Sequence, residues 1–139
     1  ATKDEWRRRI VYQVVTDRFA RGSLSTSPAN CDTLFQPTDC VDCCPWGDYC
    51  GGTLRGLWEN LDYIQGLGFD AIWISPIVVN TPCGYHGYWA QVMNSVNQHF
   101  GSEAEMRLLL DEAHKRGMLV MVDVVFNHMG NMHNGTVVP

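Results

Sequence analysis

The chain has 139 residues, enough for one domain with a sizeable apolar core. Its 10 Lys and Arg against 15 Asp and Glu give a formal net charge of −5. That balance argues against a nucleic-acid partner, which needs a basic surface, and the three arginines at 7–9 are interpreted as a solvated approach to the first strand. No apolar run approaches the roughly 18 residues that a membrane span needs, so no membrane partner is expected.

The cysteines are unevenly distributed: Cys31, Cys40, Cys43, Cys44 and Cys50 are close together, and Cys83 lies alone downstream. An even number favours disulfides and an oxidising compartment, although six cysteines allow fifteen pairings and the sequence does not choose among them. The alternative is a zinc knuckle built on Cys40, Cys43 and Cys44 with Cys50, which lacks the second C-x₂-C pair of a typical zinc ribbon. We therefore expect a secreted protein, and we interpret Ala1 as the N-terminus left after a signal peptide is removed.

The first half of the chain predicts a strand, a helix and a second strand. Residues 10–16 (IVYQVVT) are β-branched and aromatic and predict the first strand, and residues 22–52 lack periodicity and predict a long loop. Thr53 can cap a helix over 54–67, whose apolar residues keep helical spacing before Gly66 and Gly68 end it. Residues 70–75 (DAIWIS) predict the second strand, and residues 77–97 a second long connection.

A second helix and a third strand follow. Ser102 and Glu105 form the capping box of a helix that Gly117 ends. The next stretch, residues 118–129 (MLVMVDVVFNHM), is typical of a parallel strand buried on both faces, with Asp123 inside the strand and Asn127 and His128 at its carboxyl end. A buried carboxylate is costly alone, so Asp123 is expected to have a partner.

Strand, helix, strand, helix and strand in this order predict an α/β fold with parallel strands and right-handed crossovers. The two long loops and the polar residues fall after strands, where barrels and open α/β sheets place their chemistry. A (β/α)8 TIM barrel needs about 250 residues. We therefore expect residues 1–139 to be the N-terminal part of a barrel domain, incomplete as given, that includes the third strand and the start of the following loop.

The chain resembles the N-terminal region of the secreted fungal α-amylases of glycoside hydrolase family 13. The order and rough spacing of the matching runs agree from residue 6 to residue 130. In chain order these runs are Tyr12 with TDRFA at 16–20, CGGT at 50–53, LDYIQGLGF at 61–69, AIWISP at 71–76, YHGYW at 85–89 and DVVFNH at 123–128.

This resemblance implies a set of site residues. From the YHGYW run, His86 is expected to bond sugar hydroxyls and Tyr88 to stack on a sugar ring, with Trp89 lining the same cleft. At the end of the third strand, Asn127 is expected to bind a structural calcium, the implied cofactor, and His128 to bind the sugar at the cleavage point. Asp123 would support the active-site network. Without the family, His86, His128 and Asn127 would be interpreted as ordinary loop and turn residues, and Tyr88 and Trp89 could equally be loop anchors on the rim of a barrel.

Two features depart from the family. The segment 31–50 is longer than the family's short disulfide loop and has three extra cysteines, so a Cys31–Cys50 disulfide is a hypothesis and the other pairings stay open. The connection from Pro76 to His86 is also shorter than expected, which leaves the shape of the nearby sugar subsites open. Near the end of the chain, Asn134 begins an Asn-Gly-Thr acceptor for N-glycosylation.

Retaining glycoside hydrolysis uses two carboxyl groups about 5–5.5 Å apart, which this family takes from later strands. Asp17 is interpreted as an ion-pair partner of Arg18, so no catalytic residue is expected in this chain. The complete protein is expected to be a monomeric, secreted endo-hydrolase of α-1,4-glucans such as starch and maltooligosaccharides, and the 139-residue chain alone to be inactive. The alternatives are a transglycosylase of the same family, a non-catalytic fragment that binds sugar through Tyr88 and His86, and a cysteine-knuckle metal protein.

Overall fold

A computed structural model describes residues 1–23, 49–81 and 83–130. Three parallel strands form one sheet in the order β1–β2–β5, and β3 and β4 form a separate antiparallel pair. The predicted α/β fold with a parallel sheet is confirmed. In chain order the elements are α1 (Lys3–Trp6), β1 (Val11–Val14), α2 (Thr16–Phe19), α3 (Leu54–Glu59), α4 (Leu61–Gly66), β2 (Ala71–Ile74), β3 (Val78–Asn80), β4 (Ala90–Val96), α5 (Glu103–Lys115) and β5 (Leu119–Val122).

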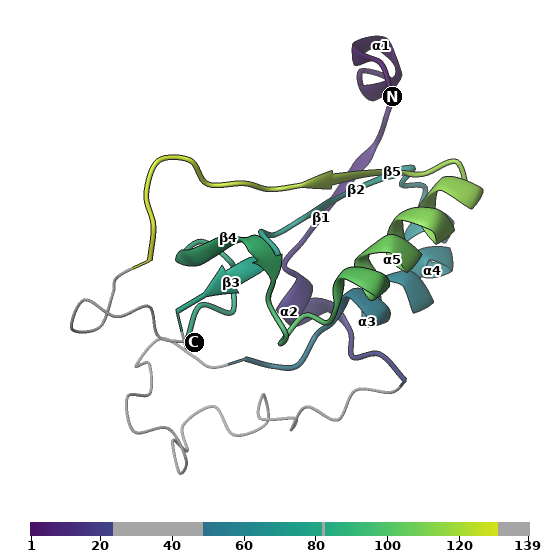
Figure 1. Cartoon of the computed structure of the whole chain (residues 1–139). Helices are drawn as coiled ribbons and strands as arrows, with labels where there is room; N and C mark the ends of the chain where they lie inside the picture. The colour runs from purple at the N-terminus through teal and green to yellow at the C-terminus, as the bar shows by residue number, and fades with distance from the viewer. Residues whose placement is uncertain (24–48, 82, 131–139) are drawn as a thin grey trace, which may run out of the picture.

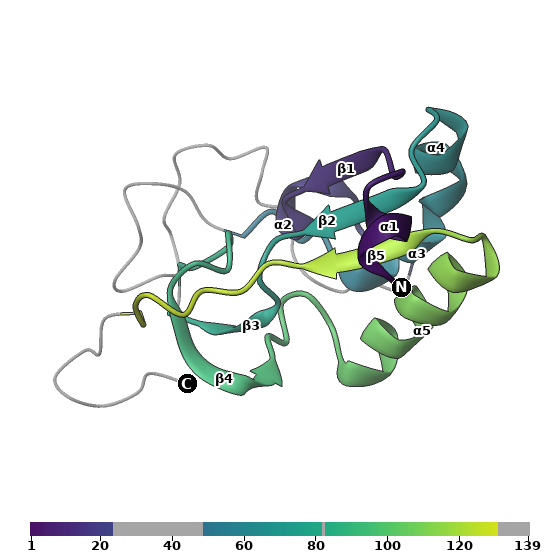
Figure 2. The same cartoon turned by 90° about the horizontal axis from the view of Figure 1, so that it is seen from above.

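The sheet and its helices form two layers. Ala71 at the start of β2 lies opposite Val11 of β1 and Leu119 of β5, so all three strands begin at one level and end at one level. Helices α3, α4 and α5 lie together on one side of this sheet, and the β3/β4 hairpin lies beyond the carboxyl end of β2 (Figures 1 and 2). Within the described ranges, no helix is long and apolar enough to cross a membrane.

The core lies between these two layers. The leucines and the isoleucine of α3 and α4 recur at helical spacing, so each helix has one apolar face. These faces pack against the apolar residues of β2 and α5. Replacing one such side chain by alanine lowers the free energy of unfolding by about 2–5 kcal/mol. The packing of the helices on the sheet therefore fixes the position of the strand ends. The fully buried residues of this core include Leu54, Leu57, Leu61, Ile64, Ile72, Ile74, Leu109 and Met118.

Two expectations from the sequence, on a helix and on a long connection, are wrong in detail. The helix expected over 54–67 is two helices, α3 and α4, which meet at Asn60 with φ −114° and ψ 17°. The Asn60 side chain donates to the Gly56 carbonyl (2.8 Å) and so competes with the helical backbone bonds. The long connection 77–97 contains the β3/β4 hairpin, which was not expected.

The third strand also differs from its prediction. β5 ends at Val122, so Asp123 lies just after the strand instead of inside it, and the β5 residues are half-buried instead of buried on both faces. The cause is its position: among the described residues, β5 is hydrogen-bonded to β2 alone. Phe126, four residues after β5, is 88% exposed.

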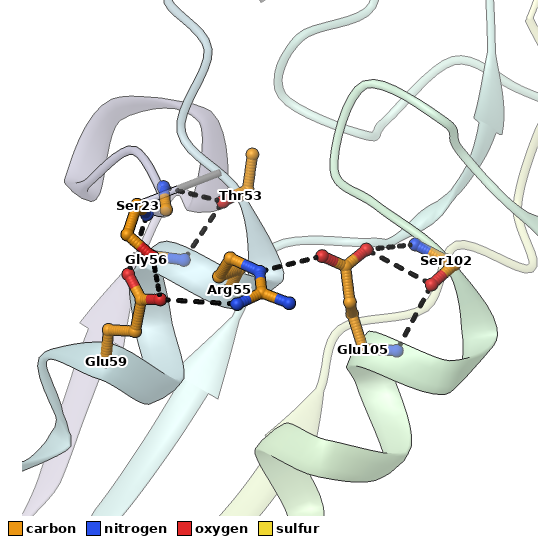
Figure 3. A network of polar contacts seen from close by, with 8 residues as sticks. Ser23, Thr53, Arg55, Gly56, Glu59, Ser102 and Glu105 are labelled. Atoms are coloured by element: carbon orange, nitrogen blue, oxygen red, sulfur yellow. Dashed lines mark hydrogen bonds and ion pairs between the residues drawn. The ribbon is translucent and has the colours of Figure 1, made fainter. Parts of the chain in front are cut away.

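Polar contacts join α3 to α5 (Figure 3). The Thr53 hydroxyl accepts the Gly56 N–H (2.9 Å) and caps α3 as predicted. Arg55 then donates to Glu59 in its own helix (3.5 Å) and to Glu105 in α5 (3.3 Å). Helices α3 and α5 are thereby held in one relative position at their N-terminal ends.

The predicted capping box of α5 is present. The Ser102 hydroxyl accepts the Glu105 N–H (3.2 Å), and the Glu105 carboxylate accepts the Ser102 N–H (2.9 Å). We expect Ser102→Ala to lower the free energy of unfolding by about 1 kcal/mol, measured by urea titration, because an N-terminal N–H of α5 loses its acceptor. Ser102→Thr, which keeps the hydroxyl, is the control, and an equal loss in both variants would contradict the capping role.

Candidate functional site

Two segments that follow neighbouring strands meet at Tyr88. The loop 83–89 joins β3 to β4 within the connection that follows β2, and residues 123–128 follow β5. The Tyr88 hydroxyl donates to the Asp123 carboxylate (2.8 Å), and His128 Nε2 lies 3.0 Å from the Tyr88 carbonyl oxygen. The Asp123 N–H donates to the Ile74 carbonyl (3.0 Å), which keeps this segment aligned with the end of β2. The structure therefore brings Tyr88, Asp123 and His128 together at the carboxyl edge of the sheet.

The partner expected for Asp123 is the Tyr88 hydroxyl. Burial raises the pKa of Tyr88, and the hydrogen bond to Asp123 and its negative charge raise it further. The phenol therefore stays protonated at neutral pH and remains a donor. As a result the Tyr88 ring is held at its tip by Asp123 and at its backbone by the 83–89 loop, so its orientation is fixed from both ends.

A tight turn before Tyr88 depends on Gly87. Its φ is +84°, a region that side-chain-bearing residues rarely adopt, and a Cβ there would lie 2.1 Å from the Pro76 carbonyl oxygen. The Gly87 N–H donates to the Gly84 carbonyl (2.9 Å) and closes the turn. The turn thus lies directly against the end of β2, which positions the flanking His86 and Tyr88.

His86 lies at the centre of a group of aromatic rings. Its ring centroid is 5.0 Å from that of Tyr85, 5.7 Å from Tyr88 and 4.4 Å from Trp89. The Tyr88 N–H donates to His86 Nδ1 (3.0 Å), which requires an unprotonated Nδ1 and places the proton of the neutral ring on Nε2. Burial lowers the pKa of His86, and the positive charge of Arg18 lowers it further.

The lowered pKa of His86 predicts a pH dependence. Because the unfolded chain binds the proton more readily than the folded protein, the stability that neutral His86 contributes is complete above its ordinary pKa of 6.5. It is lost as the pH falls through the lower pKa of the folded state. We expect thermal unfolding between pH 7 and pH 4 to show a smaller decrease in Tm for His86→Gln than for the unchanged protein. Equal decreases would contradict the assignment.

Trp89 and Asn127 lie at the periphery of this group. Trp89 is 38% exposed, and its backbone N–H donates to the Asn80 side-chain oxygen (2.6 Å), an anchor that was not expected from the sequence. Asn127 is exposed, and its Nδ2 lies 3.2 Å from His128 Nδ1.

Within residues 1–23, 49–81 and 83–130 no group of three or more His, Cys, Asp or Glu could hold a metal ion. These residues do not build the implied calcium site, to which Asn127 offers one neutral oxygen.

Asp17 is buried at the carboxyl end of β1, 2% exposed. Its carboxylate accepts the N–H groups of Cys50 (2.8 Å) and Gly51 (3.1 Å) and forms the predicted ion pair with Arg18 (2.5 Å). Burial raises the pKa of Asp17, and these donors and the charges of Arg18 and His99 oppose the rise. A carboxylate with its oxygens bound in this way has a structural role.

Cys50 and Cys83 are both disulfide-bonded. The knuckle alternative used Cys50 as a zinc ligand, which a disulfide sulfur does not provide. The sequence left the state of Cys83 open, and nothing in a single sequence marks which cysteines pair. Cys31, Cys40, Cys43, Cys44 and Asn134 lie outside the described residues, so the Cys31–Cys50 pairing and the glycosylation site stay predictions.

Sequence reasoning missed one further contact at this edge. The Arg18 guanidinium lies over the Tyr85 ring, with Cζ 3.8 Å from the ring centroid, and it also contacts the Cys50 sulfur. Both Arg18 and Tyr85 belong to runs that match the family pattern. Their membership in those runs was the available signal, but it does not reveal that the two side chains touch.

Known proteins are similar to this chain in sequence. The family model for the α-amylase catalytic domain matches residues 13–136. The α-amylase mde5 of Schizosaccharomyces pombe is 47% identical over 135 residues, which are 93% of this chain and 23% of that protein. The α-amylase of Saccharomycopsis fibuligera is 44% identical over 138 residues, 95% of this chain and 26% of that protein.

A solved structure agrees with these sequence relatives. The α-amylase from Malbranchea cinnamomea superposes with a TM-score of 0.77 at 51% identity, over 93% of this chain and 26% of that one. The chain thus spans about a quarter of the length of the proteins that it matches. On the family model, these identities and the shared fold, the chain belongs to the α-amylase family, glycoside hydrolase family 13.

Proposed function

We propose that the chain forms the N-terminal part of the catalytic barrel of a secreted enzyme that cleaves internal α-1,4-glucosidic bonds in starch and related glucans with retention. The observation that carries this proposal is the convergence on Tyr88 of His86, from the loop between β3 and β4, and of Asp123 and His128, from the segment after β5. An aromatic face flanked by hydrogen-bonding side chains is the chemistry that a pyranose ring needs.

Each residue then has a defined task in sugar binding. The Tyr88 ring stacks on the apolar face of a glucose unit, and Asp123 holds that ring through its hydroxyl. Neutral His86 has its proton on Nε2, a donor for a sugar hydroxyl, because Nδ1 accepts the Tyr88 N–H. His128 bonds the sugar at the cleavage point, and Trp89 adds an exposed aromatic surface beside His86.

The reacting carboxyl groups lie outside these residues. A retaining enzyme needs a nucleophile and a proton donor about 5–5.5 Å apart. Asp17 is buried with both oxygens accepting hydrogen bonds, and Asp123 is bound to Tyr88, so neither is free to attack a sugar. We therefore assign no catalytic residue to the 139-residue chain and expect it alone to be inactive. A structural calcium would take one oxygen from Asn127 and the others from elsewhere in the protein.

Secretion fits the same proposal. Disulfide-bonded Cys50 and Cys83 require an oxidising compartment, and glycosylation at Asn134 would occur there. The complete enzyme would act as a monomer on glucan chains.

The proposal is tested with the protein made from the complete reading frame. We expect it to release new reducing ends from starch, with products that have the α-configuration when first formed, as nuclear magnetic resonance would record. The 139-residue chain should release none. Products longer than a maltooligosaccharide substrate would indicate transfer to a second sugar instead of hydrolysis. A folded complete protein without action on starch would overturn the proposal.

A further inference from the structure

A continuous row of side chains crosses the carboxyl ends of the three parallel strands. It begins at Asp17 and Arg18 after β1, continues through the 83–89 loop and ends at Asp123 after β5. Each neighbouring pair in the row is in contact. The members in order are Asp17, Arg18, Tyr85, His86, Tyr88 and Asp123.

The Arg18 end of this row is fixed. Arg18 forms its 2.5 Å ion pair with a carboxylate that is itself buried and held by two backbone N–H groups. The guanidinium also contacts the Cys50 sulfur. A planar cation with a fixed position offers its face to an aromatic ring, which lysine cannot do in the same way.

The Tyr85 ring lies on that guanidinium face. At 3.8 Å from Cζ to the ring centroid, the contact is well inside the range of a cation–π interaction. The next residue is His86, whose ring is packed edge-on to Tyr85 with an interplanar angle of 70°. A displacement of Tyr85 would therefore move the ring that precedes Tyr88.

We propose that Arg18 and Tyr85 are positioning residues, which hold His86 and Tyr88 in the orientation that binds a glucose unit. This inference rests on the proposed function of Tyr88 and His86. It assigns a task to two residues that have no sugar contact in the proposed function: the anchored cation holds the Tyr85 ring, and that ring holds His86. The loop between β3 and β4 is thus held by Arg18 of α2, the short helix that follows β1.

Two other restraints act on the same loop and define the rival explanation. Cys83 is disulfide-bonded, and Gly87 lies against the Pro76 carbonyl. If these two restraints are sufficient, the Tyr85 ring is only packing and its loss leaves the sugar-binding side chains in place.

The test compares Tyr85→Leu with Tyr85→Phe in the complete protein. Phenylalanine keeps the ring over Arg18, and leucine removes it. We expect Tyr85→Leu to lower kcat/KM for maltooligosaccharides about tenfold, the effect of losing a partly buried cation–π contact, with Tyr85→Phe within about twofold of the unchanged protein. Arg18→Lys keeps the charge without the planar face, so it should lower kcat/KM as Tyr85→Leu does. If Tyr85→Leu does not fold, the comparison of Arg18→Lys with Tyr85→Phe tests the same proposal.

A second measurement does not depend on catalysis. The imidazole signals of His86, assigned with His86→Gln, should move in Arg18→Lys, which keeps the Tyr85 ring near His86, and stay unchanged in Tyr85→Phe. If the complete protein lacks activity but the His86 signals move as described, the proposed function fails and the positioning role stands. If the unchanged protein is active, all three variants match it in kcat/KM and Arg18→Lys leaves the His86 signals in place, the positioning role is overturned.

Discussion

Replacing Asp17 by alanine is expected to lower the free energy of unfolding by about 3–5 kcal/mol, because it leaves a partly buried cation without its partner. The carboxylate accepts the N–H groups of Cys50 and Gly51 and pairs with Arg18, so three donors lose their acceptor at once. The expected measurement is urea unfolding at neutral pH, followed by circular dichroism. The same change should loosen Arg18 and lower the affinity for maltooligosaccharides.

Two variants make this prediction specific. Asp17→Asn keeps the shape and one acceptor oxygen, so its loss should be smaller than that of Asp17→Ala. Asp4→Ala breaks an ion pair with Arg7 whose side chains are 77% and 64% exposed, and surface pairs of this kind contribute little. If Asp17→Ala cost no more than Asp4→Ala, the buried carboxylate would not be the anchor of this strand end.

The parts of the fold that local chemistry determines were predictable from the sequence. The capping box at Ser102 and Glu105 marked the start of α5 because both residues act within one turn. The helix break at Asn60 was not predictable from periodicity, since Leu57, Leu61 and Ile64 keep their spacing through it and remain buried on one face. Periodicity records which face is apolar and does not record whether the backbone bonds continue.

The β3/β4 hairpin lacked a usable signal for a different reason. β3 has three residues, and its pairing with β4 is irregular on both sides of Val79, so neither strand shows sustained alternation. The connection between the strands spans residues 81–89, too long for the short turns that identify hairpins. The half-buried state of β5 could likewise not be predicted from its own residues, because it depends on which strands lie beside it.

In the candidate site too, the residue types could be predicted from the sequence and the contacts between distant residues could not. The residue types in the YHGYW and DVVFNH runs pointed to sugar chemistry through their resemblance to a family. The contact between Tyr88 and Asp123 joins residues 35 positions apart, and no spacing rule within a strand or helix predicts it. Arg18 and Tyr85 meet for a similar reason, because parallel strands bring the loops at their carboxyl ends to one edge of the sheet.

Replacing Gly87 by alanine is expected to lower kcat/KM of the complete protein on maltooligosaccharides about 100-fold, the size of effect that follows from a displacement of about 1 Å in a binding group. The new Cβ would lie 2.1 Å from the Pro76 carbonyl oxygen, and φ of +84° is unfavourable for alanine. The backbone must therefore shift, and Tyr88, the next residue, shifts with it. Initial rates over a range of substrate concentrations measure the effect.

The matched control for this change is Gly66→Ala. Gly66 is the last residue of α4, and a Cβ there would meet no atom within 4 Å, so alanine should fit and raise helix stability slightly. Thermal unfolding of both variants separates a displaced loop from general unfolding, since Gly87→Ala should stay folded at the assay temperature while losing activity. A Gly87→Ala protein as active as Gly66→Ala would mean that the turn against Pro76 does not set the position of Tyr88.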